Sequence, residues 1–269
     1  MPMQIKDEGT GNSYRLDADQ FDAGAEIVIR GNDNTIEIGA DVDLLAPKIH
    51  IQGSGNSIRL ATEMVEVVDP AEECKTPFIL HASSREAEII VLGDGNSIEA
   101  GRYTEIYDST VQIVGDDNSV KLGHRVRAHM KIDFHTTGAL FEVGDHTTCV
   151  GMHAALHESR TLRLGKDCQL AADIYLTVSD THPIYDLDTG ERINVGKDVE
   201  VGDHVWLGFR TVILKGSKVG SGSTIGTCTV VAGSIPENCV AVGNPARVVK
   251  RNVTWQRELV PEPTIKAVG

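Results

Sequence analysis

The chain has 269 residues, enough for one large domain or two small ones. Its formal net charge of −14 argues against a nucleic-acid partner, because binding to a phosphate backbone depends on clustered lysine and arginine. Only 4% of the residues are aromatic whereas 27 are glycine, a composition that favours a solenoid with a narrow aliphatic core and tight corners.

The start of the chain, MPMQIKDEGTGN, lacks the apolar segment of a signal peptide. No stretch approaches the roughly 18 apolar residues that a membrane-spanning helix needs. The five cysteines include no Cys-x-x-Cys pair, and their odd number and irregular spacing indicate reduced thiols that fill the core. These features predict a cytoplasmic protein that does not insert into a membrane.

A phrase of a polar turn followed by a short alternating strand repeats in the N-terminal half. It occurs at residues 31–36, 53–58, 93–98 and 115–120, as GNDNTI, GSGNSI, GDGNSI and GDDNSV. The first and last steps are equal and slightly longer than three hexapeptides, which fits a triangular coil with extra residues at one corner, or a wider right-handed coil. The middle step is almost twice as long and predicts an irregular coil with a loop at 69–77.

A polar segment at 179–194 (SDTHPIYDLDTGERIN) lacks this repeat and predicts a loop that projects from the coil. After it, an aliphatic residue recurs at every sixth position: Val195, Val201, Leu207, Ile213, Val219, Ile225 and Val231. A period of six fits neither a helix nor an ordinary strand. It fits a solenoid of three short faces with one inward side chain on each face, and therefore favours the triangular coil.

In the tail, Asn252 predicts the cap of a short helix that runs to about Leu259, before Pro261 and Pro263 stop it. The chain is thus expected to be an all-β solenoid with a short C-terminal helix. Its expected parts are N-terminal coils over 1–178, the projecting loop over 179–194, hexapeptide-repeat coils over 195–250, and the helix and tail over 251–269.

The stretch from Gly196 to Lys250 resembles the hexapeptide-repeat acyltransferases. The matching phrases are Val205-Trp206-Leu207-Gly208, Ile225-Gly226-Thr227, Ser234-Ile235-Pro236 and, at 242–250, VGNPARVVK. The loop phrase His182-Pro183-Ile184-Tyr185, followed by GERIN at 190–194, is more specific. It resembles the capsular polysaccharide O-acetyltransferases, in particular those that modify polysialic acid. The close match covers about residues 173–258, and only the repeat pattern is shared upstream.

The resemblance implies a left-handed parallel β-helix, a homotrimer, and acetyl-CoA bound in a groove between adjacent subunits. It also implies that a sugar hydroxyl attacks the thioester directly, without an acyl-enzyme. We therefore expect an O-acetyltransferase that modifies a carbohydrate, such as a capsular or other surface polysaccharide. The alternatives are an N-acetyltransferase or small-molecule acetyltransferase of the same superfamily, and a solenoid that binds a partner without turnover.

His182 is the candidate general base. A hydroxyl attacks a thioester readily only when a base takes its proton, and histidine, with a pKa near 6.5, suits this task. His182 lies in the polar loop before a proline, and it matches the base of the family. Asp180 is a candidate for orienting its imidazole, although it also fits a turn cap, and Glu191 is a rival.

Trp206 precedes the inward Leu207, so its side chain should point outward, where it needs a ligand or a partner subunit to cover it. The matching family position lies beside the thioester and assists catalysis. The tetrahedral oxyanion also needs hydrogen-bond donors. The backbone amide of Gly208 or Phe209 is a candidate, since glycine lets a ligand approach the main chain.

Further residues match the family positions that bind coenzyme A. Arg247 and Lys250 match a clamp for its phosphates, although a solvated basic end of the protein is the alternative. Three others match positions that line the pantetheine arm: Phe209, Thr227 and Ala232. Trp255 either covers the adenine or packs the C-terminal helix.

His153 and His157 lie four residues apart, a spacing that binds metals on a helix. This region has the pattern of a strand, so the two imidazoles should not converge, and no metal is expected. His153 is instead a candidate for the acceptor pocket, and His204 is expected at a corner of the coil.

Overall fold

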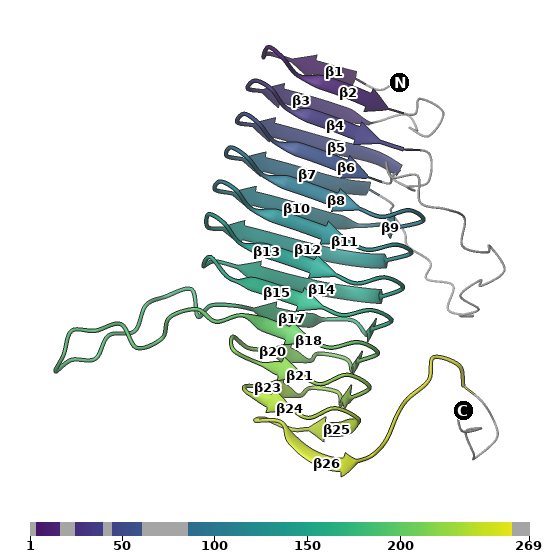
Figure 1. Ribbon diagram of the computed structural model, residues 1–269, viewed down its shortest axis with the longest axis vertical. Helices are drawn as coiled ribbons and strands as arrows, with labels where there is room; N and C mark the ends of the chain where they lie inside the picture. Colours follow the sequence, from purple (N-terminus) through teal and green to yellow (C-terminus); the bar gives the residue numbers. More distant parts are fainter. Residues whose placement is uncertain (1–3, 17–24, 40–44, 61–85, 260–269) are drawn as a thin grey trace.

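The computed structural model describes residues 4–16, 25–39, 45–60 and 86–259. Over these residues the chain winds as a left-handed parallel β-helix, with its strands stacked coil upon coil (Figure 1). This confirms the solenoid that the repeats and the resemblance predicted. The described part contains no helix long and apolar enough to cross a membrane.

One sheet of the described chain consists of ten short parallel strands, each paired with the strands of the coils before and after it. They are β2 (Ser13–Leu16), β4 (Thr35–Ile38), β6 (Ser57–Leu60), β8 (Ser97–Ala100), β11 (Ser119–Leu122), β13 (Leu140–Val143), β15 (Thr161–Leu164), β18 (Val199–Val201), β21 (Lys218–Val219) and β24 (Ser234–Ile235).

A second sheet contains the sixteen other described strands. They are β1 (Gln4–Asp7), β3 (Glu26–Arg30), β5 (Leu45–Gln52), β7 (Glu86–Leu92), β9 (Glu105–Ile106), β10 (Ser109–Val114), β12 (Arg127–His135), β14 (Thr148–Leu156), β16 (Gln169–Leu170), β17 (Ile174–Thr177), β19 (Trp206–Leu207), β20 (Val212–Ile213), β22 (Thr224–Ile225), β23 (Val230–Val231), β25 (Cys239–Val242) and β26 (Arg247–Arg251). After β14 it divides into two rows, β16-β19-β22-β25 and β17-β20-β23, so the coil has three faces.

The length of one coil changes along the solenoid. Val219 pairs with Val201, which is a coil of three hexapeptides, whereas Ile58 pairs with Ile36 across a longer coil. Strand β12 of one longer coil pairs with both β9 and β10 of the coil before it, so three faces are seen there as well. Strand β6 pairs directly with β8, so the long middle step of the repeat is a single coil. The loop predicted at 69–77 falls outside the described residues.

Buried asparagines stack at one corner of the N-terminal coils. They are Asn34, Asn56, Asn96 and Asn118, each at most 2% exposed. Each side-chain amide donates to the Oδ1 atom of the asparagine one coil earlier and to a backbone carbonyl of the next coil. This ladder explains the asparagine of the repeated phrase, because it satisfies polar groups that the corner buries.

The glycine that opens each phrase is required by the close stacking of the coils. Gly53 and Gly93 have φ values of 143° and 145°, in the region that favours glycine. A Cβ atom on Gly53 would lie 2.0 Å from the carbonyl oxygen of Gly93. No larger residue fits there without moving the backbone.

The outer face of the ten-stranded sheet carries a column of charges that alternate in sign from coil to coil. In register order the column is Arg15, Glu37, Arg59, Glu99, Lys121, Glu142, Arg163, Glu200 and Lys218. Ion pairs of 2.8 Å between Arg163 and Glu142, and of 3.3 Å between Lys218 and Glu200, join neighbouring coils. Opposite charges directly across a strand pair stabilise the pairing.

The aliphatic hexads point inward with one exception. Six of them, from Val201 to Val231, are at most 2% exposed, as predicted. Val195 is 45% exposed, so its prediction as an inward residue was wrong. It lies before β18, where the chain is still returning from the projecting loop. The buried hexads therefore begin at Val201.

The predicted C-terminal helix is also wrong for the residues described. Strand β26 folds back antiparallel on β25, and residues 252–259 then run along the coil as an extended segment, here called the strap (Figure 1). Asn252 has a φ of 57°, which is incompatible with the extended backbone of a helix N-cap. The side chains of Trp255 and Arg257 contact the coil instead, and these contacts override the local helix signal.

The cysteines only partly follow the prediction that they fill the core. Cys149, Cys168 and Cys239 are buried free thiols, whereas Cys228 is exposed at a corner. Cys74 lies outside the described residues.

Candidate active site

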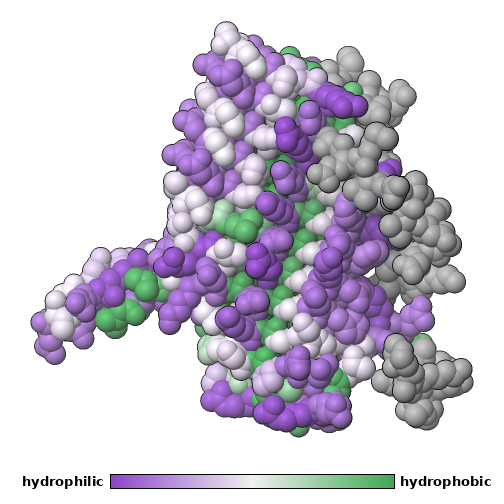
Figure 2. Space-filling view, in the orientation of Figure 1, coloured by the Kyte–Doolittle hydropathy of each residue, from purple (hydrophilic) through white to green (hydrophobic). Residues whose placement is uncertain are grey.

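The loop between β17 and β18 projects far from the coil as a two-stranded arm, here the arm (residues 179–194) (Figure 1). A bridge between Tyr185 and Arg192 and a backbone hydrogen bond of 2.9 Å from Ile193 to Ile184 hold its two sides together. Apolar side chains gather on it, visible as a hydrophobic patch in Figure 2. They are Ile184, Tyr185, Leu187 and Ile193, all more than half exposed. Such a patch marks a contact surface.

Glu158, just after β14, anchors both ends of the arm. Its carboxylate accepts hydrogen bonds from the Ser179 hydroxyl (2.7 Å), the Gly196 amide (2.9 Å) and the Arg192 guanidinium (2.6 Å). Burial opposes its ionisation, but these donors outweigh burial and lower its pKa to about 2. The base of the arm is therefore fixed to the coil by a charged group that stays ionised at neutral pH.

His182 lies on this anchored arm with its side chain exposed to solvent. Its backbone amide donates to the carbonyl of Asp180 at 2.7 Å, and its carbonyl accepts from the Asn194 side chain at 2.9 Å. Main-chain bonds thus fix the position of the residue and leave the imidazole accessible to a substrate. Its role as a base stays a prediction.

Asp180 makes no hydrogen bond to the imidazole of His182 in the described chain. Its carboxylate forms an ion pair with Lys215 and accepts a hydrogen bond of 2.9 Å from Asn194. The hydrogen bond from Lys215 lowers the pKa of Asp180 below its ordinary value. The side chain therefore fastens the arm to the corner at Lys215. The hydrogen bond to the His182 imidazole that its predicted orienting role would require is not formed in the described chain. The rival Glu191 is exposed further out on the arm.

Trp206 points outward from β19, opposite in direction to the buried Leu207, as predicted from the hexads. Its ring centre lies 6.2 Å from that of Trp255 in the strap. Trp255 stacks on His204 with ring centres 4.4 Å apart and donates from Nε1 to the His204 carbonyl at 2.8 Å. His204 itself lies in the turn before β19. The predicted packing of Trp255 on a helix is thus replaced by packing on this turn.

Arg257 fastens the strap to two successive coils. Its guanidinium donates to the side chains of Asp167 (2.9 Å) and Thr148 (2.7 Å) and to the carbonyls of His146 (3.1 Å) and Cys168 (2.9 Å). Only planar guanidinium geometry supplies so many donors at once. The strap therefore forms one wall beside Trp206.

The two backbone amides proposed to bind the oxyanion differ in whether they already donate a hydrogen bond. The Gly208 amide donates to the carbonyl of Ile225 at 2.7 Å, as part of the stacking between coils. The Phe209 amide makes no hydrogen bond to any described residue. Of the two, only the Phe209 amide is available to a ligand.

The three residues predicted to line the pantetheine arm of the coenzyme lie at two places on the coil. Phe209 and Thr227 are exposed at the same corner of adjacent coils, where the Cys228 amide donates to the Phe209 carbonyl at 2.8 Å. Ala232 is exposed after β23, on the next face. Arg210 lies over the Phe209 ring, 4.8 Å from its centre.

Arg247 and Lys250 lie on β26, the antiparallel strand that closes the end of the solenoid. Residues three apart normally face opposite sides of a strand. Here the register shifts, so that Arg247 pairs with Val242 and Lys250 with Val240. Because these partners are two residues apart, the shift brings both cations to the same, outward side.

His153 and His157 do not share a site, as expected of a strand. His153 forms an edge-to-face contact with Tyr175, with ring centres 5.3 Å apart. Burial is the main cause that lowers the pKa of His153 from its ordinary value. Its predicted place in an acceptor pocket stays untested. His157 instead meets two residues of the preceding coil, Asp133 and His135.

Sequence reasoning missed Glu158, Lys215 and Asn194, which together fix the arm. Asn194 closes the phrase GERIN but was not singled out, whereas Glu158 and Lys215 belong to no recognisable phrase, and the partners of these two lie 21 to 38 residues away in the chain. Only the stacking of coils brings them together. The projection of a polar segment from the coil was the one available signal.

Comparison with known proteins agrees with this architecture. Residues 198–233 match the family model "Bacterial transferase hexapeptide (six repeats)". The polysialic acid O-acetyltransferase of Neisseria meningitidis is 35% identical over 174 residues, which cover 64% of this chain and 80% of that protein. The polysialic acid O-acetyltransferase of Escherichia coli O1:K1 is 35% identical over 122 residues, which cover 45% of this chain and 40% of that protein.

The crystal structure of the polySia-specific acetyltransferase NeuO has the same fold. It superposes with a TM-score of 0.57 and 24% sequence identity, covering 98% of this chain and 92% of that one. The likeness extends over the whole solenoid, including the N-terminal coils outside the hexapeptide match.

Proposed function

Because the chain belongs to the hexapeptide-repeat acetyltransferases, as a relative of the polysialic acid O-acetyltransferases, we propose that it transfers an acetyl group from acetyl-CoA to a hydroxyl of a polysaccharide. The observation that carries the proposal is the exposed imidazole of His182 on an arm whose base is fixed by Glu158 and Asp180. A mobile loop would not hold a base at a defined distance from a thioester.

In this reaction the imidazole of His182 takes the proton of the attacking hydroxyl. The hydroxyl oxygen forms a bond to the acetyl carbonyl carbon, and the Phe209 amide donates to the oxyanion that develops. When the thioester bond breaks, the imidazolium returns its proton to the departing sulfur. Trp206 and the strap exclude water from the thioester, which protects it from hydrolysis.

The arm and the Trp206 corner lie on different faces of the coil. The arm leaves the coil after β17, whereas Trp206 lies on β19 and Phe209 at the corner that follows it, in the other row of strands. We propose a homotrimer in which the arm of one subunit reaches the Trp206 corner of the next. The apolar side chains of the arm support this arrangement, since a partner subunit would cover them.

Neutralising the cations of β26 is expected to weaken coenzyme binding. The double variant Arg247→Gln, Lys250→Gln should raise the KM for acetyl-CoA about tenfold or more, with a smaller effect on kcat, because it removes charge-assisted hydrogen bonds to phosphate. Initial rates at varied acetyl-CoA measure this. Lys218→Gln, an exposed cation paired with Glu200 on another face, is the control and should leave the KM unchanged. An equal rise in both proteins would contradict the clamp.

The acceptor class is tested by incubating the full chain with acetyl-CoA and four acceptors in parallel. These are polysialic acid, a neutral polysaccharide, a free amino sugar and water alone, with release of the coenzyme thiol and mass of the acceptor as readouts. Ester-linked acetyl on a polysaccharide supports the proposal. Amide-linked acetyl on the amino sugar alone would overturn it in favour of N-acetyl transfer, and absence of acetyl-CoA binding would favour a scaffold.

A further inference from the structure

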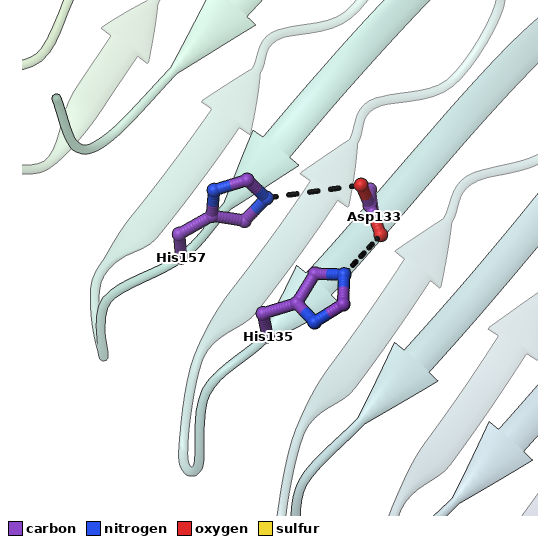
Figure 3. Close-up of side chains that lie close together, drawn as sticks. All are labelled: Asp133, His135 and His157. Atoms are coloured by element: carbon purple, nitrogen blue, oxygen red, sulfur yellow. Dashed lines mark ion pairs between the residues drawn. The ribbon is translucent and has the colours of Figure 1, made fainter. Parts of the chain in front are cut away.

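Three side chains converge on the outer face of the coil near the root of the arm (Figure 3). Asp133 and His135 belong to β12, and His157 directly follows β14. The His135 Nε2 atom lies 3.1 Å from one carboxylate oxygen of Asp133, and the His157 Nε2 atom lies 3.7 Å from the other. One potential ligand atom from each residue lies within 4.8 Å of the others.

The stacking of coils explains why these residues meet. Strands β12 and β14 pair in parallel with Asp133 opposite Ala155, so the position stacked on the carboxylate holds only a methyl group. His157 lies two residues further on, on the same outward side, and its imidazole occupies the space above Asp133 (Figure 3). A larger residue than Ala155 would separate the carboxylate from the imidazole.

Two shielded polar atoms of the cluster lack a hydrogen bond within the described chain. They are the Nε2 atom of His157 and the Oδ1 atom of Asp133, to which His135 Nε2 comes within 3.1 Å without hydrogen-bond geometry. The side chains of Asp133 and His157 are 15% and 21% exposed. Shielded polar atoms without a partner are unfavourable, and an ion between them would supply the missing interactions.

The Nδ1 atom of His157 has its own partner, the hydroxyl of Thr181, at 3.1 Å. When Nδ1 donates its proton to this hydroxyl, the lone pair of Nε2 faces the carboxylate of Asp133. Two electron-rich atoms then face each other, a contact that a cation between them makes favourable. A hydrogen bond from the second ring nitrogen is the usual way in which proteins orient a metal-binding histidine.

We propose that Asp133, His135 and His157 bind a zinc ion, with water completing the coordination. The His135 and His157 Nε2 atoms approach different oxygens of the Asp133 carboxylate, at 3.1 Å and 3.7 Å, and both separations are close to the roughly 3.4 Å between ligand atoms about 2.1 Å from a tetrahedral ion. Two imidazoles and one carboxylate suit zinc and disfavour magnesium, which prefers oxygen ligands. The carboxylate at the centre of the cluster argues against an anion at this place.

Zinc at this place would also hold the arm. Thr181 is the neighbour of His182, so an ion that fixes His157 fixes the start of the arm through the hydrogen bond to Thr181. This consequence rests on the proposed function of His182. The binding of zinc itself does not, and the two are measured separately.

The test uses the untagged full chain, freed of metal with a chelator and titrated with zinc in competition with a chromophoric chelator. We expect one zinc per chain and a rise in the melting temperature on binding. Asp133→Asn and His157→Ala should each weaken zinc binding at least about tenfold, and Thr181→Val should weaken it about tenfold through loss of the outer hydrogen bond. Magnesium should not compete.

His153→Ala is the matched control, because His153 lies four residues before His157 on the same strand face and outside the cluster. It should bind zinc like the wild type. Circular dichroism of each metal-free variant establishes that it is folded. Absence of zinc binding in the wild type, equal binding in Asp133→Asn, or equal competition by magnesium would overturn the proposal. A chain that binds zinc without transferring acetyl would instead overturn the proposed function and leave the zinc site standing.

Discussion

Replacement of His182 by alanine should lower kcat by roughly two orders of magnitude or more, the usual effect of removing a general base. The attacking hydroxyl would keep its proton until the carbon–oxygen bond had formed, which raises the barrier. The KM for acetyl-CoA should change little, because His182 lies on the arm and away from the cations of β26. Steady-state kinetics with acetyl-CoA and the acceptor found above would measure both constants.

The control for this variant is His129→Ala, which removes another exposed imidazole of the solenoid; His129 lies on β12, two coils before the strand from which the arm leaves, and its ring packs on Tyr107. It should retain wild-type kcat. Size-exclusion chromatography with light scattering should show the same oligomer for both variants and the wild type. A folded His182→Ala protein of the same oligomeric state with near-normal kcat would contradict the assignment of the base.

Replacement of Glu158 by glutamine should lower kcat about tenfold or more without removing any atom of the catalytic residues. The carboxylate ties Ser179 at the entry of the arm to Gly196 at its exit, and it neutralises Arg192. Without this charge the arm keeps only its second anchor, the ion pair between Asp180 and Lys215, and a displacement of about 1 Å at a reacting group is enough for large losses in rate. Glu142→Gln is the matched control, since Glu142 also pairs with an arginine, Arg163, at 2.8 Å but has no contact with the arm.

The loss of thermal stability in Glu158→Gln should depend on pH. The pKa of Glu158 falls from 4.5 to about 2 on folding, so its ionised form stabilises the fold fully above pH 4.5. That contribution is lost as the pH falls through the folded-state value. The melting temperature of the wild type should therefore exceed that of Glu158→Gln at neutral pH, and the difference should narrow from about pH 4.5 towards pH 2. A difference that stays constant over this range would show that the charge of Glu158 does not hold the arm.

The sequence predicted the coil well because its signal is local. Each inward residue of the six-residue period, such as Leu207 or Ile225, must be aliphatic because it fills the narrow core. Its place in the period is visible in the sequence. The buried Asn56 likewise repeats because every coil presents the same corner to the next. The arm was predicted because residues 179–194 lack the repeat of the coils. His182 was predicted as the candidate base from the phrase that it begins, His-Pro-Ile-Tyr.

What could not be predicted depends on contacts between coils and with the tail. Nothing in the local sequence of Glu158 distinguishes it from the surface glutamates of the solenoid. Asp133 and His157 belong to successive coils, and their approach depends on which coil lies above which. The tail signal at Asn252 was overridden by the stacking of Trp255 on His204. The anchoring by Glu158, the approach of Asp133 to His157 and the path of the tail all depend on which residues of different coils come into contact.

The alternating column on the ten-stranded sheet bears on how such a solenoid changes in length. If the coil of Glu99 were lost, Arg59 and Lys121 would become neighbours, and duplication of that coil would place two glutamates in register. Loss or gain of two adjacent coils keeps opposite charges together. Insertion or deletion of two adjacent coils therefore preserves the alternation of charge along the column. Insertion or deletion of a single coil places like charges in register, which is unfavourable.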